Sequence, residues 1–228
     1  MGKGAGVFIR FDRLFPRAPF ISPNLQEGII RAGTNTKKSK LGIWTTKSIV
    51  TMAVGAALYG VLMVYGGVPI FSNTNLSFAM VVPVFVGALF GPLPAMITCG
   101  IGNVIADLIG GWGMWFDWSI GNAVMGFFVG TLPLYGADIA NGLFKVKHAI
   151  IYAVMCVLGN IIAFGLITPI FSTALYGQDL NITLMQALFA TLGNTLVLVV
   201  AGIPILTMLA KRNASRSNLK KETDDSEY

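Results

Sequence analysis

The stretch FGPLPAMITCGIGNVIADLIGGWGMWFDWSIGN, residues Phe90–Asn122, constrains the fold more than any other part of the chain. It opens on a Gly-Pro-Leu-Pro turn, continues as an apolar run over Pro94–Gly110, and ends in three tryptophans, a phenylalanine and an aspartate within Gly110–Asn122. A turn of this kind marks a break between two elements, and a continuous apolar run indicates a membrane helix. Two carboxylates and three indoles therefore gather between two predicted membrane helices.

The composition agrees with a membrane protein. The 228 residues are 54% hydrophobic and only 11% charged, with a mean hydropathy of +0.71, whereas a soluble domain usually carries about 25% charged residues. The first 45 residues are basic and lack the long apolar core of a cleaved signal peptide. Cys99 and Cys156 lie inside apolar runs, so we expect small packing residues and no disulfide.

We predict an all-α integral membrane protein with six transmembrane helices. A bilayer needs about 20 apolar residues per helix, and the first, fifth and sixth runs satisfy this best. The second run is short and holds Pro83, which indicates a kinked or incomplete span and makes a five-span chain the main alternative. The six predicted spans are Lys47–Gly66, Leu76–Phe90, Pro94–Gly110, Trp118–Tyr135, His148–Thr168 and Thr183–Ala210.

The positions of Lys and Arg predict the orientation. Of the 16, nine lie at or before Lys47, two lie between the fourth and fifth spans, and the last five follow the sixth. Six spans place all three groups on one side, which the positive-inside rule makes cytoplasmic, whereas five spans would divide them. We therefore expect a multi-pass protein of the cell membrane with both termini cytoplasmic. The outer loops are then Gly67–Asn75, Gly111–Asp117 and Pro169–Ile182.

This topology divides the chain into a basic cytoplasmic segment (residues 1–46), a six-helix membrane domain (47–210) and a polar cytoplasmic tail (211–228), which we expect to be disordered. In the first segment, GVFIRFDRLFPR places Phe8, Phe11 and Phe15 on one helical face and its arginines mostly on another. It is either an interfacial helix on the anionic inner leaflet or a mobile basic arm.

Four Gly-Asn pairs occur in four successive predicted spans, and their amides are Asn103, Asn122, Asn160 and Asn194. The last two lie roughly 16–18 Å into their spans at 1.5 Å per residue. A carboxamide in hydrocarbon is costly without a partner, and the glycines allow close helix approach. Each asparagine alone could be a packing contact between helices, but four at related depths favour a shared polar cavity open to the outside.

The opening stretch adds candidates at the mouth of this cavity. Asp107 shares a helical face with Asn103, four residues earlier, and an ionisable residue at membrane depth is a functional candidate. Asp117 is either a ligand contact or a helix N-cap. The indoles form either an interfacial aromatic belt or a stacking wall for a flat ligand. The three indoles belong to Trp112, Trp115 and Trp118.

Several chemistries are missing from the sequence. The one histidine, His148, falls at a predicted cytoplasmic end, and no His, Cys or carboxylate cluster has metal-ligand spacing. No phosphate-binding loop and no nucleophile–base pair is apparent, so we expect no enzymatic activity, no cofactor, no metal and no nucleic-acid partner. Outer loops without Lys or Arg disfavour a strongly anionic ligand, and they favour a neutral or cationic one.

From Lys47 to Ala210 the chain resembles the substrate-binding S components of energy-coupling factor (ECF) vitamin transporters. The resemblance rests on three motifs and on the six-span topology. AVGAA in the first span contains Ala53 and Ala57 with AxxxA spacing, FGPLPAMITCGIGNVIADLIGG is similar to the family's glycine-rich third span, and WSIGNAVMGFFVG is similar to its fourth. The N-terminal extension departs from the compact family pattern.

The resemblance implies a mechanism and partners. An S component captures a vitamin-like micronutrient from outside under the loop GGVPIFSNTN, which follows the first span. It then docks through the face of Ala53 and Ala57 on a membrane coupling (T) subunit that carries two ATPases, and it tilts to release the substrate inside. The absence of outer histidines argues against nickel or cobalt, and the absence of outer cations against folate-like polyanions. A thiamine-, riboflavin- or modified-base-like molecule is expected.

Two other classes of function remain at this stage. A structural membrane scaffold would use the asparagines as packing contacts and the tryptophans as an interfacial belt, and it would bind no ligand. A small membrane enzyme would need an activated nucleophile or a metal, and neither is visible in the sequence.

Overall fold

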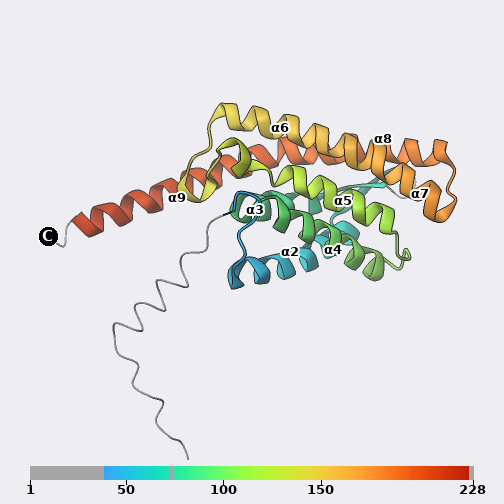
Figure 1. Ribbon diagram of the computed structural model, residues 1–228, viewed down its shortest axis with the longest axis horizontal. Helices are drawn as coiled ribbons and strands as arrows, with labels where there is room; N and C mark the ends of the chain where they lie inside the picture. Colours follow the sequence, from blue (N-terminus) through green and yellow to red (C-terminus); the bar gives the residue numbers. More distant parts are fainter. Residues whose placement is uncertain (1–38, 72–73, 226–228) are drawn as a thin grey trace, which may run out of the picture. The chain divides into compact units, whose positions relative to one another are not determined.

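The computed structural model describes residues 39–71 and 74–225, with side chains described as far as residue 216 (Figure 1). The segment GVFIRFDRLFPR, for which we weighed an interfacial helix against a basic arm, lies outside the described residues. The described part belongs to one compact unit that begins at Lys38. It is mostly helical, as the sequence predicts.

The first half of the unit contains four α-helices and a β-hairpin. The hairpin is a departure from the all-α prediction and occupies the predicted first outer loop. Its strands pair antiparallel, with Gly67 opposite Ser77 and Phe71 opposite Thr74. In chain order the elements are α2 (Thr46–Tyr65), β1 (Gly67–Phe71), β2 (Thr74–Ser77), the 3₁₀ turn η2 (Phe78–Met80), α3 (Val81–Phe90), α4 (Pro92–Gly110) and α5 (Phe116–Val129).

The second half contains longer helices. A π-helical segment, η5, joins α6 to α7 without a break in the helix, and α9 follows α8 after a single residue. Figure 1 shows α6 and α8 side by side, and the two helices are in contact. The elements are the 3₁₀ turns η3 (Leu132–Tyr135) and η4 (Ile139–Asn141), α6 (Val146–Asn160), η5 (Ile161–Ile167), α7 (Thr168–Tyr176), α8 (Leu180–Val200) and α9 (Gly202–Asp225).

Four helical stretches of the described residues are long and apolar enough to cross a membrane. The predicted second span is a shorter apolar helix, Phe78–Phe90, and α5 has only 14 residues. Pro83 does not break the second span, because it lies in the first turn of α3, where a backbone N–H has no helical partner. The four long stretches are Thr46–Tyr65, Pro92–Gly110, Val146–Tyr176 and Leu180–Arg216.

The Gly-Pro turn of the opening stretch forms as predicted. Gly91 has φ +96°, a conformation that side-chain-bearing residues rarely adopt, and Pro92 occupies the first turn of α4, where proline is favoured. Gly102 in the middle of α4 lets this helix approach α2 closely. A Cβ there would lie 2.8 Å from Cδ1 of Tyr59.

Two predicted boundaries were wrong. The predicted fifth span was to end at Thr168, but α7 continues to Tyr176, because the wide turns of η5 directly precede Pro169 and accommodate the missing N–H donor. The predicted fourth span was to reach Tyr135, but α5 ends at Val129, before a Gly-Thr pair and the 3₁₀ turn η3.

The last helix also differs from the prediction. α9 is helical to Asp225, within the tail for which we expect disorder. A preceding membrane helix removes the cost of nucleation, so the Ala-, Lys- and Arg-containing sequence after residue 210 extends it. The assignment of this tail, and of the segment before residue 47, as separate cytoplasmic parts stays a prediction.

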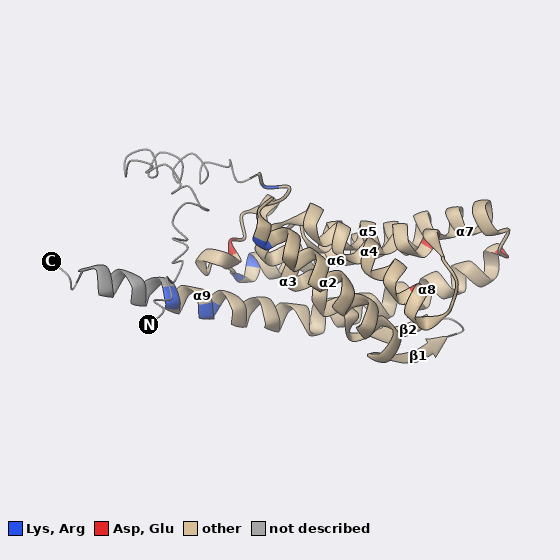
Figure 2. Ribbon diagram, turned by 90° about the horizontal axis from the view of Figure 1, so that it is seen from below, with Lys and Arg blue, Asp and Glu red and all other residues tan. Residues whose placement is uncertain are grey.

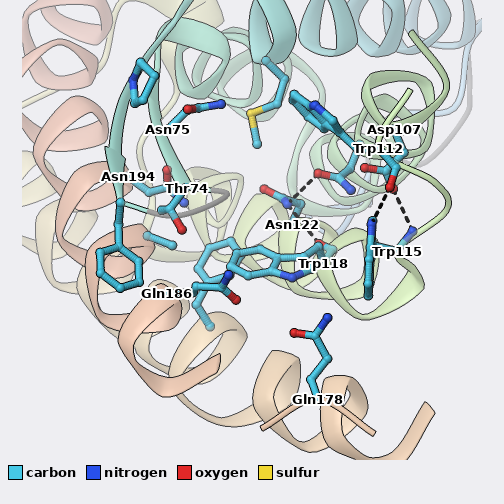
Figure 3. A pocket seen from close by; sticks show the side chains of 16 residues that line it. Thr74, Asn75, Asp107, Trp112, Trp115, Trp118, Asn122, Gln178, Gln186 and Asn194 are labelled. Atoms are coloured by element: carbon cyan, nitrogen blue, oxygen red, sulfur yellow. Dashed lines mark hydrogen bonds between the residues drawn. The ribbon is translucent and has the colours of Figure 1, made fainter. Parts of the chain in front are cut away.

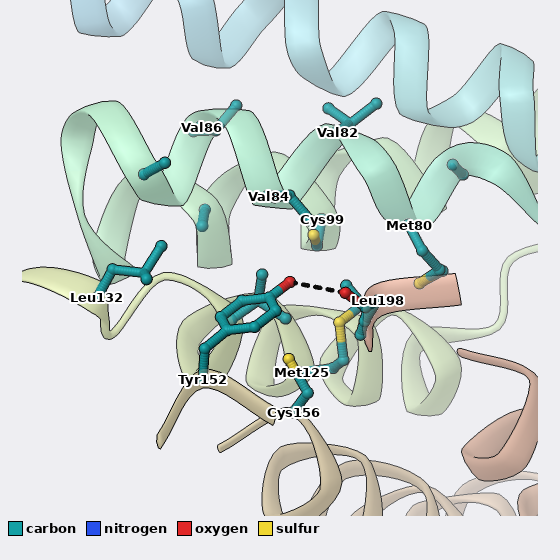
Figure 4. Packing of buried hydrophobic residues seen from close by; sticks show 14 of the residues in the cluster. Met80, Val82, Val84, Val86, Cys99, Met125, Leu132, Tyr152, Cys156 and Leu198 are labelled. Carbon is teal, nitrogen blue, oxygen red and sulfur yellow. Dashed lines mark hydrogen bonds between the residues drawn. The ribbon is translucent and has the colours of Figure 1, made fainter. Parts of the chain in front are cut away.

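The core forms around α3, which explains why this short helix is so apolar. Its side chains are buried on nearly all sides, with Phe85 as the exposed exception, as expected for a helix inside a bundle. Figure 4 shows Val84 of α3 near side chains of the surrounding helices, which include Cys99 of α4, Tyr152 of α6 and Leu198 of α8. Both cysteines are buried and free, as predicted.

Positive charge gathers at one end of the unit. Figure 2 shows the described Lys and Arg residues at the end where α9 extends away, near the turns that precede α6. Asp107 lies in α4, Asp117 in the first turn of α5 and Asp179 at the N-cap of α8, whereas Asp138 lies in the turns that precede α6. A bundle with cations at one end is what the positive-inside rule requires of a chain with a single cytoplasmic face.

Candidate functional site

A cavity of about 420 Å³ opens near the hairpin and the tryptophan stretch (Figure 3). Its size suits a small organic ligand, because ligand pockets typically measure roughly 300–1,000 Å³. Side chains from α2, the hairpin, α4, α5, η5 and α8 meet there. The lining residues are Met63, Pro69, Phe71, Thr74, Asn75, Asn103, Asp107, Trp112, Trp115, Trp118, Asn122, Phe164, Gln178, Gln186, Ala190 and Asn194.

The structure brings most of the predicted site residues together. Two of them, Asp117 and Asn160, are fully buried and do not line the cavity. The predicted residues that do line it are Asn103, Asp107, Trp112, Trp115, Trp118, Asn122 and Asn194. All three tryptophans face the cavity, and Trp112 is also 46% exposed. Trp112 can therefore belong both to an interfacial aromatic belt and to the wall on which a ligand would stack.

Hydrogen bonds between side chains form the floor of the cavity. Nδ2 of Asn122 donates to Oδ1 of Asn103 (2.9 Å) and to the carbonyl of Trp118 (2.9 Å). Oδ1 of Asn122 accepts from the hydroxyl of Tyr59 at 2.6 Å, and Nδ2 of Asn103 donates to Oγ of Ser119 at 3.1 Å. Both N–H groups of Asn122 are therefore used within the protein, and one N–H of Asn103 is left.

Asp107 lies one helical turn beyond Asn103, close to the end of α4, and is 4% exposed. Its Oδ2 accepts the backbone N–H of Trp115 at 3.0 Å. The indole N–H of Trp115 in turn donates to the carbonyl of Trp112 at 2.9 Å. Asp107 thereby holds the loop between α4 and α5 in place, and the indoles of this loop become one wall of the cavity.

A polar stripe on α7 holds the other side of this loop. Thr168, Ser172 and Tyr176 are spaced four residues apart and so share one helical face. Ser172 donates to the carboxylate of Asp117. The Tyr176 hydroxyl accepts from the N–H of Phe116 (3.0 Å) and donates to the carbonyl of Met114 (3.1 Å).

Asp117 therefore contacts the stripe and not the cavity. The predicted N-cap role is also absent, because α5 begins at Phe116 with Trp115 at its N-cap. Thr168 donates to the backbone carbonyl of Asp117 at 3.4 Å, and the rings of Tyr176 and Trp115 lie 4.7 Å apart. Asp117 therefore helps to position the tryptophans that line the cavity, from the side that packs on α7.

Asn160 is a packing residue in this structure. Its side-chain Nδ2 donates to the backbone carbonyl of Cys156 in the preceding turn at 2.8 Å. The backbone carbonyl of Asn160 accepts from the hydroxyl of Thr191 of α8 at 3.5 Å. The side chain is fully buried and is not among the residues that line the cavity. This side chain thus neither lines the cavity nor bonds to another helix, whereas Gly159 beside it allows close approach to Phe128 of α5.

Asn194 and the covering loop were predicted, but the other lining residues of α8 and the individual residues of the hairpin were not. Gln186, Ala190 and Asn194 are spaced four residues apart, so one face of α8 presents two amides to the cavity. The glutamine in an otherwise apolar run was the signal that could have identified this face. Gln178, which precedes α8, and Phe164 in η5 carry no comparable pattern.

The hairpin covers the cavity through packing on α8. The ring of Phe71 stacks on that of Phe189 with centroids 4.6 Å apart and planes at 12°. Gly193 of α8 leaves room for Ile70, whose Cδ1 would be 3.1 Å from a Cβ at that position. Pro69 and Asn75, opposite each other in the hairpin, both line the cavity.

The lining carries one ionisable group. Asp107 is the only acidic residue among the lining residues, which include no Lys, Arg or His. The other polar groups are amides and a threonine, and the apolar surface is mostly aromatic. Such a surface suits a flat molecule with hydrogen-bonding edges, because indoles stack on rings and amides bind donors and acceptors. The described residues hold no acidic, His or Cys cluster suited to a metal.

Outside the cavity, α2 presents a second surface of interest. Its inner face packs on α4 through buried residues such as Gly55 and Ala56, whereas Ala53 and Ala57 are exposed. Apolar side chains flank them, with Val54 62% and Leu58 49% exposed. The predicted AxxxA face is thus exposed in the part of the chain that the structure describes.

The comparison with known families now identifies the class of protein. A family model described as "ECF-type riboflavin transporter, S component" matches residues 43–211. The chain belongs to this S component family. ECF S components are membrane-embedded, substrate-binding subunits of vitamin transporters and not enzymes, and they work with a T component and ATPases. This confirms the resemblance found in the sequence and the expectation that the chain has no catalytic activity of its own.

The relatives and a solved structure agree with the family. A UPF0397 protein of Aliivibrio fischeri (strain MJ11) is 35% identical over 178 residues, which cover 77% of this chain and 96% of the relative. A UPF0397 protein of Photobacterium profundum is 33% identical over 180 residues, covering 78% and 97%.

The crystal structure of FolT bound with folic acid superposes with a TM-score of 0.53 at 19% identity, covering 74% of this chain and 96% of FolT. This likeness shows that the S component fold is shared. At this identity it carries no information on which ligand this chain takes.

Proposed function

We propose that this chain is the substrate-capture subunit of an ECF importer and that it binds a small, flat, neutral or cationic vitamin-like molecule from outside. The observation that carries the proposal is the cavity of about 420 Å³, in which aromatic walls and amides surround a single carboxylate. A pocket with these properties is the default binding-site hypothesis in a transport subunit.

The proposed topology has six spans with both termini cytoplasmic. It is supported by the gathering of the described Lys and Arg residues at one end of the bundle, which the positive-inside rule makes the inner end. The cavity residues Asp107 and Trp112 lie at the end of α4 that is remote from those cations, so the cavity opens outward. The hairpin is then the outer cover of the site.

The proposed partners are a membrane coupling (T) subunit and two ATPases. The surface of α2 around Ala53 and Ala57 supports this proposal, because small residues let a partner helix approach its backbone closely. A ligand bound at the outer end would be released inward only when these partners reorient the subunit, since the described chain supplies no phosphate-binding loop of its own.

Folate-like polyanions are not proposed, although FolT shares the fold. A bound polyanion needs Arg or Lys donors, and the lining includes neither. Riboflavin, which the family description names, is uncharged and remains a candidate on these grounds.

The test is purification from the membrane followed by mass spectrometry of any small molecule that remains bound, with riboflavin and thiamine then titrated into ligand-free protein. Tryptophan emission is the readout, because three indoles line the cavity. A saturable change that is lost in Trp115→Ala supports the proposal. If no molecule is recovered and no probe changes the emission, the chain is a scaffold without a ligand.

A further inference from the structure

We infer that the ligand of this cavity carries a positive charge, which Asp107 binds, and presents an uncharged hydrogen-bonding edge to the amides at the opposite end. The inference rests on the proposed function and narrows its substrate class from neutral or cationic to cationic. Three observations carry it, and they concern the free atoms of the cavity, the absence of a counter-charge, and the arrangement of the aromatic rings.

The first observation is which polar atoms remain free for a ligand. Asn122 uses both of its N–H groups within the protein, and its oxygen already accepts from Tyr59, so it is a structural part of the floor. Asp107 has only its Oδ2 engaged, and no described residue donates to its Oδ1. The free acceptor at this end of the cavity is therefore a carboxylate oxygen.

The second observation is the lack of any positive group around this carboxylate. The lining includes no Lys, Arg or His. The carboxylate of Asp107 accepts one hydrogen bond, from the backbone N–H of Trp115. A nearly buried carboxylate with one hydrogen bond is costly to keep in a low-dielectric site unless a cation neutralises it. A neutral ligand would leave that cost in place, whereas a cationic ligand removes it.

The third observation is the position of the aromatic rings. Figure 3 shows Trp112 and Trp115 close to Asp107, and Trp118 beside Asn122 in the centre of the cavity. The faces of indole rings attract cations, so the wall and the carboxylate favour the same charge at the same end.

The opposite end of the cavity has a different chemistry. Asn75 of the hairpin and Asn194 of α8 lie there (Figure 3), and the side-chain amide of neither is hydrogen-bonded to another described residue. Amides bind donors and acceptors without a preference for charge. The ligand that fits both ends is a flat heterocycle with a cationic group at one end and an uncharged amino, lactam or amide edge at the other.

The experiment compares probes that differ in a single charge. 1-Methylnicotinamide and nicotinamide share a ring and a carboxamide, and only the first carries a fixed positive charge. Thiamine, riboflavin and folic acid extend the comparison to larger cationic, neutral and anionic molecules. Binding to the full-length protein is followed by tryptophan emission and thermal stability, and mass spectrometry identifies the molecule that co-purifies with the wild type.

We expect the wild type to bind the cation of the matched pair about 10- to 100-fold more tightly than its neutral partner, as a charge-assisted contact provides. Asp107→Asn should abolish that preference. The matched control is Asp117→Asn, a buried aspartate that does not line the cavity. This control changes both affinities by the same factor, so the ratio stays at the wild-type value.

The outcomes separate this inference from the proposed function. A neutral probe that binds as tightly as its cationic partner, a preference that survives in Asp107→Asn, or an uncharged or anionic co-purified molecule overturns the cationic class and leaves the capture function intact. A protein from which nothing co-purifies and to which no probe binds overturns both.

Discussion

The hydroxyl of Tyr59 offers a direct test of whether the amide floor shapes the cavity. This side chain is fully buried and does not line the cavity, yet it donates to Oδ1 of Asn122 at 2.6 Å. Tyr59→Phe removes that donor and leaves the ring in place. Asn122 then keeps its two donated bonds, but its oxygen has lost the partner that sets the plane of the amide.

The magnitude follows from the environment of the bond. A hydrogen bond between membrane helices contributes about 0.6 kcal/mol on average and up to about 1.7 kcal/mol, and an acceptor left unsatisfied by burial places this case near the upper end. We therefore expect ligand affinity to fall about three- to tenfold, and the melting temperature to drop by about 3–7 °C.

A matched variant separates the cavity from general stability. Tyr152 is also fully buried and donates one hydrogen bond, to the carbonyl of Leu198 at 3.2 Å, but it belongs to the core around α3 (Figure 4). Tyr152→Phe should lower the melting temperature by a similar amount and leave affinity within about twofold of wild type.

The assay is titration of the molecule that co-purifies with the wild type, followed by tryptophan emission, beside thermal unfolding of both variants. If Tyr59→Phe binds as tightly as wild type, or if Tyr152→Phe loses as much affinity, the amide floor has no special part in shaping the site.

Three further predictions concern packing, the loop and assembly. Gly102→Ala should destabilise the protein by about 1–3 kcal/mol, measured by thermal unfolding. Gly165→Ala should have a smaller effect, because the nearest neighbour lies 3.8 Å from the added Cβ. Equal losses of stability in the two variants would contradict the close packing of α4 on α2. Ser172→Ala should weaken ligand binding by less than about tenfold and alter tryptophan emission without ligand, and unchanged emission would count against the α7 stripe. Ala57→Trp should prevent co-purification with the T subunit while ligand titration stays as in wild type, and an intact complex would exclude this face.

Much of the site followed from helical periodicity. Asn103 and Asp107 are four residues apart on one apolar run, so a helix had to place them on one face, and the tryptophans follow directly at its end. The Gly91-Pro92 pair predicted the break between α3 and α4, because glycine allows a turn and proline restricts the backbone. In each case a local rule decided the outcome.

The remainder depended on which face each helix turns to its neighbours. Asn160 and Asn194 lie at similar predicted depths in their spans, yet Asn194 lines the cavity and Asn160 bonds to its own helix. Depth along a helix can be counted in the sequence, but rotation about its axis is set by packing against other helices. The π-helical turns of η5 increase the difficulty, because each changes the rotation of every residue that follows.

The same principle explains why Asp117 was misplaced. The sequence places both Asp107 and Asp117 at the outer ends of neighbouring helices, and both are nearly or fully buried. Asp117 is hydrogen-bonded to Thr168 and Ser172 of α7. The sequence analysis placed Thr168 at the end of a span and Ser172 in an outer loop, so it could not predict these partners. Because Asp117 is hydrogen-bonded to α7, one carboxylate faces the cavity and not two. If the ligand is a cation, as we infer, a cavity with a single carboxylate bounded by uncharged amides should bind a monocation more tightly than either a dication or a neutral molecule.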